Sequence, residues 1–102
     1  MTQAANKFLY IVVGVSVPGT AEQVTQHYIP DGYGPATITA RDGNGGNMFV
    51  ADSQTNAQTA ASRKVLIPGQ STALNIDDTS RIWVDAESSS DRLEITVQKP
   101  LG

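Results

Sequence analysis

The chain has no cysteine and holds only one tryptophan and one histidine in 102 residues. Without thiols it forms neither disulfides nor thiolate metal sites, and its composition suits reducing and oxidising compartments alike. The seven lysines and arginines are scattered, and the formal net charge is -3. Because binding to phosphate backbones needs a basic patch, we expect no nucleic-acid partner.

Long apolar runs are also missing. The most apolar segment, residues 7–17, is too short to cross a bilayer, so we expect no membrane partner. One lysine followed by an apolar run is also the layout of a signal peptide. The segment is rich in β-branched and aromatic residues and lacks a clear small-residue cleavage site, which favours a buried strand instead.

No catalytic constellation is visible. The segment 14–18 resembles a nucleophile elbow around Ser16, but it carries Pro18 where the strained turn needs glycine. His27 is the sole histidine, so a metal site built from nitrogen ligands is not expected. Carboxylates in the second half leave a calcium site open as an alternative, although their spacing is not diagnostic. We therefore predict a protein that is not an enzyme, with no cofactor and no catalytic or metal-binding residues.

The clearest pattern lies between residues 81 and 98, where two runs alternate apolar and polar residues around a Ser/Asp turn. Side chains alternate between the faces of a strand, so these runs predict a hairpin. Six residues would cover its buried side: Ile82, Val84, Ala86, Leu93, Ile95 and Val97. Trp83 would then face outward, and a large outward aromatic indicates a surface for a partner.

Turn formers divide the rest of the chain into further short strands. Strands are expected at 9–17, 36–41, 48–51, 64–67 and 72–76. We expect 36–41 and 48–51 to pair as a hairpin, 20–24 to form at most a short turn of helix, and 52–62 to be a crossover loop or one helical turn. The alternation predicts that 9–17 turns its odd-numbered residues inward and is covered on both faces at its start. Phe8 and Tyr10 share the opposite face, and Tyr28 and Tyr33 flank an irregular loop.

Seven to eight short strands with regular turn signals predict an all-β fold, an antiparallel β-sandwich or jelly roll. We expect one domain over residues 1–102, with a short N-terminal arm at about 1–7.

The order of elements over 36–98 resembles that of head decoration, or cement, proteins of tailed bacteriophages. In that order a strand is followed by an Asn/Gly turn, an aromatic-valine strand, a Leu-x-Pro-Gly turn and a second aromatic-valine strand. The matching segments are Asn44–Asn47, Phe49-Val50, Leu66–Gly69 and Trp83-Val84. The chain departs from the family where a glycine often follows the valine, since it carries Ala51 and Asp85 there.

The resemblance implies a β-sandwich that binds the outside of the major capsid protein shell and stabilises the head. It also implies a homo-oligomer, expected to be a trimer, that is made in the host cytoplasm and resides on the capsid surface of the virion. We predict five interface residues: Phe8, Tyr10, Tyr28, Tyr33 and Trp83.

Two other binding functions stay open. A tail or fibre domain of the same virus particle would have a similar strand order. A carbohydrate-binding module would use Tyr28, Tyr33 and Trp83, because flat aromatic rings pack against the apolar faces of sugars.

Overall fold

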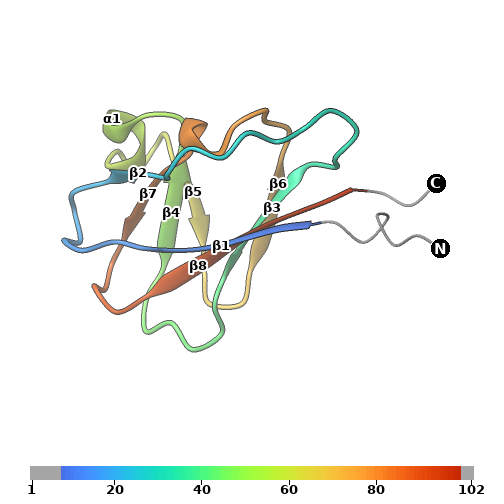
Figure 1. Cartoon of the computed structure of the whole chain (residues 1–102). Helices are drawn as coiled ribbons and strands as arrows, with labels where there is room; N and C mark the ends of the chain where they lie inside the picture. The colour runs from blue at the N-terminus through green and yellow to red at the C-terminus, as the bar shows by residue number, and fades with distance from the viewer. Residues whose placement is uncertain (1–7, 100–102) are drawn as a thin grey trace.

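Two four-stranded antiparallel sheets face each other in the computed structural model, which describes residues 8–99 (Figure 1). Sheet A has the strand order β1-β8-β3-β6, and its strands are β1 Phe8–Gly14, β8 Arg92–Gln98, β3 Ala36–Ala40 and β6 Ser71–Leu74. Sheet B has the order β2-β7-β4-β5, and its strands are β2 Glu22–Gln23, β7 Trp83–Ala86, β4 Met48–Ala51 and β5 Lys64–Leu66. The arm predicted at residues 1–7 lies outside the described residues.

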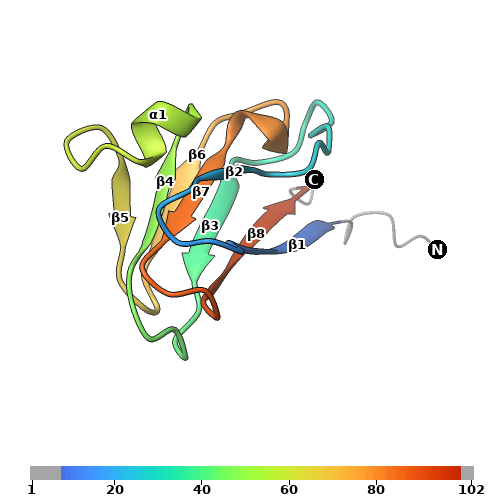
Figure 2. The ribbon, with the colours of Figure 1, turned by 90° about the vertical axis from the view of Figure 1, so that its left-hand side faces the viewer.

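The connections between strands make this sandwich a jelly roll. Each strand is followed along the chain by a strand of the other sheet. The exception is β4, which is followed by β5 of its own sheet and pairs with it. Alternation between two four-stranded sheets in these two orders is the double Greek key of a jelly roll, so the predicted all-β class is confirmed. A single helical turn, α1 (Gln54–Ala57), links β4 to β5 and lies at the end of β4 (Figure 2), within the range where the sequence predicted a loop or one helical turn.

The hydrophobic core lies between the sheets. The largest apolar side chains of the core are at most 1% exposed: Ile38, Met48, Leu66, Ile82, Leu93 and Ile95. Fully burying a side chain of this size stabilises the fold by about 1.5–3 kcal/mol. All six residues that alternation assigned to the buried side of 81–98 are in this core.

The predicted hairpins are wrong. Strand β7 belongs to sheet B and β8 to sheet A, so their apolar sides meet across the core instead of lying side by side. The same holds for β3 and β4. Alternation identifies the apolar side of each strand, and that side is the same whether the next strand lies beside it or opposite it.

The two connections that join these strands are tied together. The Asp91 carboxylate accepts the backbone N–H groups of Gly45 and Gly46 at 2.8 and 2.9 Å. A loop between β3 and β4 is thereby fixed to the loop between β7 and β8. The turn residues therefore hold a crossing between sheets where the sequence pattern predicted hairpins.

The short turn of helix predicted at 20–24 is also wrong. Glu22 and Gln23 form β2, which pairs with Val84 and Trp83 of β7. Val24, which follows, is 3% exposed, so this segment is held extended by burial against the sandwich. No helix among residues 8–99 has the length and apolar character needed to cross a bilayer.

Candidate docking surface

The part of the outer face of sheet B that lies over β4 and β7 is covered by the chain itself. The helix α1 packs on β4 and β7, and the segment before β2 lies against the same side. Beneath this cover Phe49 is 6% exposed and Asp85 only 2%. The Arg63 guanidinium lies 3.5 Å from the centre of the Phe49 ring, and Asp85 accepts the N–H of Gly19 at 2.9 Å. This part of sheet B is therefore closed to partners.

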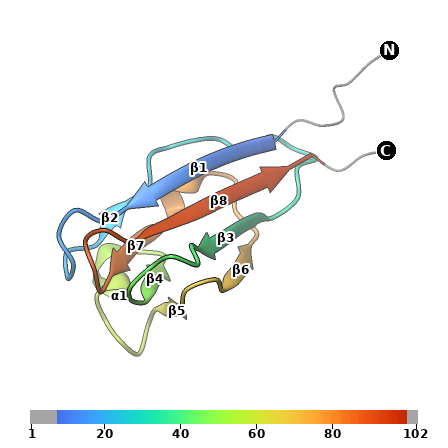
Figure 3. The same cartoon turned by 90° about the horizontal axis from the view of Figure 1, so that it is seen from below.

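The outer face of sheet A carries no such cover among residues 8–99. Its strands lie side by side in the order β1, β8, β3 and β6 (Figure 3). Most outward side chains of the other three strands are short or polar: Thr37, Thr39, Ser71, Ala73, Glu94 and Thr96. At the β1 edge stand Tyr10, 50% exposed, and Val12, 42% exposed. The prediction that the start of this strand is covered on both faces is therefore wrong.

Polar contacts hold the Tyr10 side chain against this face. Its hydroxyl donates to Glu94 Oε2 at 3.0 Å, and Arg41 Nε donates to the same oxygen at 2.7 Å. These two hydrogen bonds lower the pKa of Glu94 below its ordinary value, and the bond from Arg41 has the larger effect. The Tyr10 ring is thus anchored beside Val12 at the edge of the sheet.

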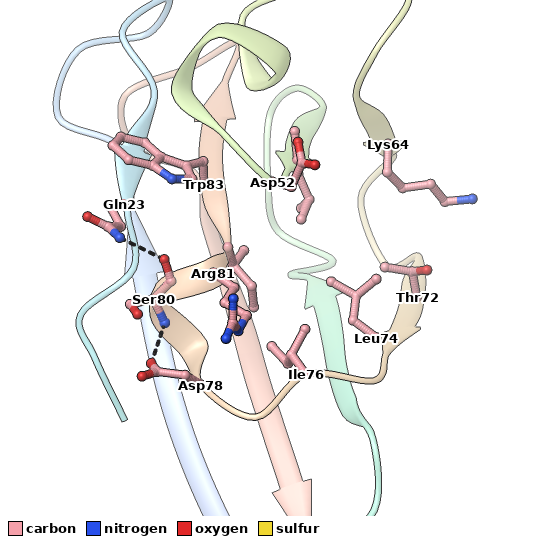
Figure 4. Close-up of a pocket in the computed structure, with 13 residues that line it drawn as sticks. Gln23, Asp52, Lys64, Thr72, Leu74, Ile76, Asp78, Ser80, Arg81 and Trp83 are labelled. Atoms are coloured by element: carbon pink, nitrogen blue, oxygen red, sulfur yellow. Dashed lines mark hydrogen bonds between the residues drawn. The ribbon is translucent and has the colours of Figure 1, made fainter. Parts of the chain in front are cut away.

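Trp83 is on the outer face of sheet B, beyond the part that α1 covers. It pairs with Gln23 on one side and Ala51 on the other, and its side chain is half-buried. It borders a pocket of about 770 Å³ at the end of the sandwich. Figure 4 shows its indole turned toward the Gln23 side of that pocket, away from Lys64.

The pocket is lined by both apolar and charged side chains. Val50, Leu74 and Ile82 are among its apolar lining residues. Asp52, Lys64 and Arg81 are among its charged lining residues (Figure 4). Arg81 is already ion-paired with Asp77, which lowers the pKa of that carboxyl. No sequence signal pointed to these pocket residues, because they come from separate strands and loops.

The three aromatics proposed for sugar binding do not share one platform. Tyr28 is 74% exposed and makes an isolated backbone bridge to Asp78. Tyr33 is half-buried, packs against the core and borders a separate pocket of about 460 Å³. That pocket shares Ile76 and Arg81 with the pocket beside Trp83, but Tyr28 lines neither of them.

The other two predicted interface residues are both on β1. Phe8 begins the strand, and its side chain lies outside what the structure describes. Tyr10 is exposed two residues later. The structure therefore separates the five candidates: Phe8 and Tyr10 are on β1, Tyr33 and Trp83 border different pockets, and Tyr28 borders neither of these pockets. Val12, which was not a candidate, is also on β1.

The carboxylates considered as calcium ligands have roles within the fold. Asp78 caps the short 3-10 helix η2 (Thr79–Arg81) by accepting the N–H of Ser80 at 2.8 Å, and Glu87 accepts the N–H of Asn47 at 2.7 Å. Asp85 and Asp91 bind backbone N–H groups as described above. Within residues 8–99, no three histidine or acidic side chains gather closely enough to hold a metal ion.

Comparisons with family models, with curated proteins and with solved structures found no match to this chain.

Proposed function

We propose that this protein is a structural assembly component that works by docking, as a decoration protein on the outside of a bacteriophage capsid. The observation that supports this most is the difference between the two outer faces, with an exposed Tyr10–Val12 patch on the uncovered one. Exposed apolar side chains at a sheet border are a usual feature of protein contact sites.

Two further points favour a viral shell as the partner. The order of motifs over 36–98 resembles that of phage cement proteins. The jelly roll also recurs in viral capsid domains, although a fold by itself does not define a function. The partners in this proposal are the major capsid protein and further copies of the chain.

Small contacts are sufficient for this role. A decoration protein is present in many copies, and linked copies attach more strongly than one copy because later contacts form at high effective concentration. The Tyr10–Val12 patch and the half-buried Trp83 would supply two such contacts on different sides of the molecule.

Co-sedimentation with shells assembled from the major capsid protein of the same genome tests the proposal. We expect the full chain to saturate the shells, and Tyr10→Ala and Trp83→Ala each to lower the occupancy. Ala73→Ser, on the opposite border of sheet A, is the control and should bind as the unmodified chain does. A chain that never sediments with shells would overturn the proposal, and immunogold labelling on tails would reassign it to a tail or fibre protein.

A carbohydrate-binding module is the second candidate, and the pocket beside Trp83 favours it. Charged and amide side chains around an apolar pocket with a neighbouring indole are the usual components of a small-ligand site. Binding to a glycan array that is lost in Trp83→Ala or Tyr33→Ala would support this function. Unchanged binding in both variants would show that neither Trp83 nor Tyr33 contributes to sugar binding.

A further inference from the structure

We infer that β1 pairs with β1 of a second copy, antiparallel across a twofold axis, and so joins two A sheets into one continuous sheet. The inference rests on the self-association part of the proposed function, names its surface, and puts a twofold dimer in place of the trimer that the resemblance implies. Twofold pairing contacts the same strand on both copies, which is the commonest form of closed symmetry.

The four border strands of the sandwich differ in length and charge. Strand β2 has two residues, including Glu22, β5 has three, including Lys64, and β6 has four. Strand β1 has seven residues and no charged side chain. Short strands and charges are the usual protection of a sheet border, and β1 has neither.

The backbone of β1 offers free bonding groups on its outer side. The carbonyls of Arg92 and Gln98 on β8 accept N–H groups from the β3 side of the sheet. In an antiparallel ladder alternate residues bond to opposite neighbours, so Leu93, Ile95 and Val97 bond to β1. Their partners on β1 are Val13, Ile11 and Leu9.

It follows that the intervening residues of β1 turn their N–H and C=O groups away from β8. These residues are Phe8, Tyr10, Val12 and Gly14. Within residues 8–99, no turn or loop bonds to the backbone of this strand. Every second residue of β1 therefore directs its backbone N–H and C=O groups outward, which is the spacing that an additional antiparallel strand requires.

One register satisfies these positions best. With the axis at Ile11, Tyr10 of each copy lies opposite Val12 of the other, and Phe8 lies opposite Gly14. All seven residues then overlap, and outward bonding residues meet outward bonding residues. Tyr10 and Val12, which are exposed large apolar side chains of β1, become direct cross-strand neighbours, and an aromatic opposite a β-branched residue is a favourable pair.

A second copy fits this border because both sides of the contact are uncharged. A strand bearing charges would place them against an apolar border without a partner of opposite sign. The contact is also small, since seven residues span only about 24 Å at roughly 3.4 Å per residue. We therefore expect a dimer that forms with rising concentration and becomes stable when copies are held together on a shell.

Sedimentation velocity over a wide concentration range tests the pairing. We expect the unmodified chain to shift from monomer to dimer, and Val12→Lys to stay monomeric at every concentration because a charge protects a sheet border. Ala73→Lys is the matched control, with the same charge added to the opposite border of the same sheet, and should still dimerise. A strictly monomeric or a trimeric unmodified chain would overturn the inference.

Cysteine cross-linking tests the register, because the chain has no thiol of its own. Residues in a hydrogen-bonded antiparallel pair are about 5.5 Å apart between Cα atoms, within the range of a disulfide. A mixture of Tyr10→Cys and Val12→Cys should oxidise to a mixed dimer, and each variant alone should cross-link much less. Efficient cross-linking of one variant alone would place the axis at that residue and overturn the register.

The two proposals fail separately. A chain that dimerises through β1 but ignores capsid shells would contradict the decoration role and leave the pairing intact. A monomeric chain that saturates shells would contradict the pairing through β1 and leave the decoration role intact.

Discussion

The two outer faces of the sandwich differ in how much of each is covered by other segments of the chain. On sheet B, α1 and the segment before β2 cover Phe49 and Asp85, and Arg63 stacks on the phenyl ring. On sheet A, Tyr10 and Val12 stand at an uncovered border. A cover contributes to folding stability but removes a surface from binding, whereas an uncovered border contributes little to stability and remains free to dock.

The largest expected effect comes from the covered face. Replacing Phe49 with Ala removes a buried ring between β4 and α1, which should lower the free energy of unfolding by about 3–5 kcal/mol. Tyr10→Ala is the matched change on the uncovered face and should alter it by only about 0.5 kcal/mol. Urea denaturation at a concentration where the protein is monomeric measures both, and equal losses would show that the two faces do not differ.

A smaller effect is expected from Asp85 under the same cover. Its carboxylate accepts the N–H groups of Gly19 and Ala86 at 2.9 and 2.8 Å. Asp85→Ala should lower the free energy of unfolding by about 1–3 kcal/mol, because the Gly19 N–H loses its partner in a poorly hydrated position. Asp85→Asn keeps one acceptor oxygen and should lose less. If Asp85→Ala denatures like the unmodified protein, the loop before β2 is not anchored by this residue.

The smallest effect should come from the ion pair on the uncovered face. Bonding to Arg41 and Tyr10 lowers the pKa of Glu94 in the folded state below its ordinary 4.5. The contribution to stability is therefore present above pH 4.5 and is lost as the pH falls through the lowered pKa. We expect the melting temperature of Glu94→Gln to fall less steeply than that of the unmodified chain as the pH is lowered below 4.5.

Arg41→Gln offers a check on the cause. It removes the main reason for the lowered pKa, so the Glu94 carboxyl should titrate closer to 4.5 in an NMR titration. An unchanged titration midpoint in this variant would mean that Arg41 does not set the pKa.

The sequence predicted which side of most strands is buried but not which strands are neighbours. Ile82, Val84 and Leu93 were assigned correctly to the core, because burial on one face imposes a period of two. The partner of each strand depends on where the connecting loop leads. The loop 87–91 carries ordinary turn residues in either case, and its crossing to the other sheet is fixed only by contacts such as Asp91 with Gly45.

The candidate surface was predicted in part. Tyr10 was found from its parity on the first strand, but its neighbour Val12 was missed because only the aromatic residues of that face were taken as candidates. A border strand differs from a central one only in having a single neighbour, which local sequence does not encode. The uncharged run over 8–14 was the available signal, and it favours a central buried strand just as well.

Amide hydrogen exchange along β1 tests the central claim most directly, that this border is a docking surface for a second copy. In dilute solution the amides of Ile11 and Val13, bonded to β8, should exchange slowly, and those of Tyr10 and Val12 should exchange fast. At high concentration we expect Tyr10 and Val12 to become protected as well. Fast exchange at Tyr10 and Val12 that does not change with protein concentration would contradict the account.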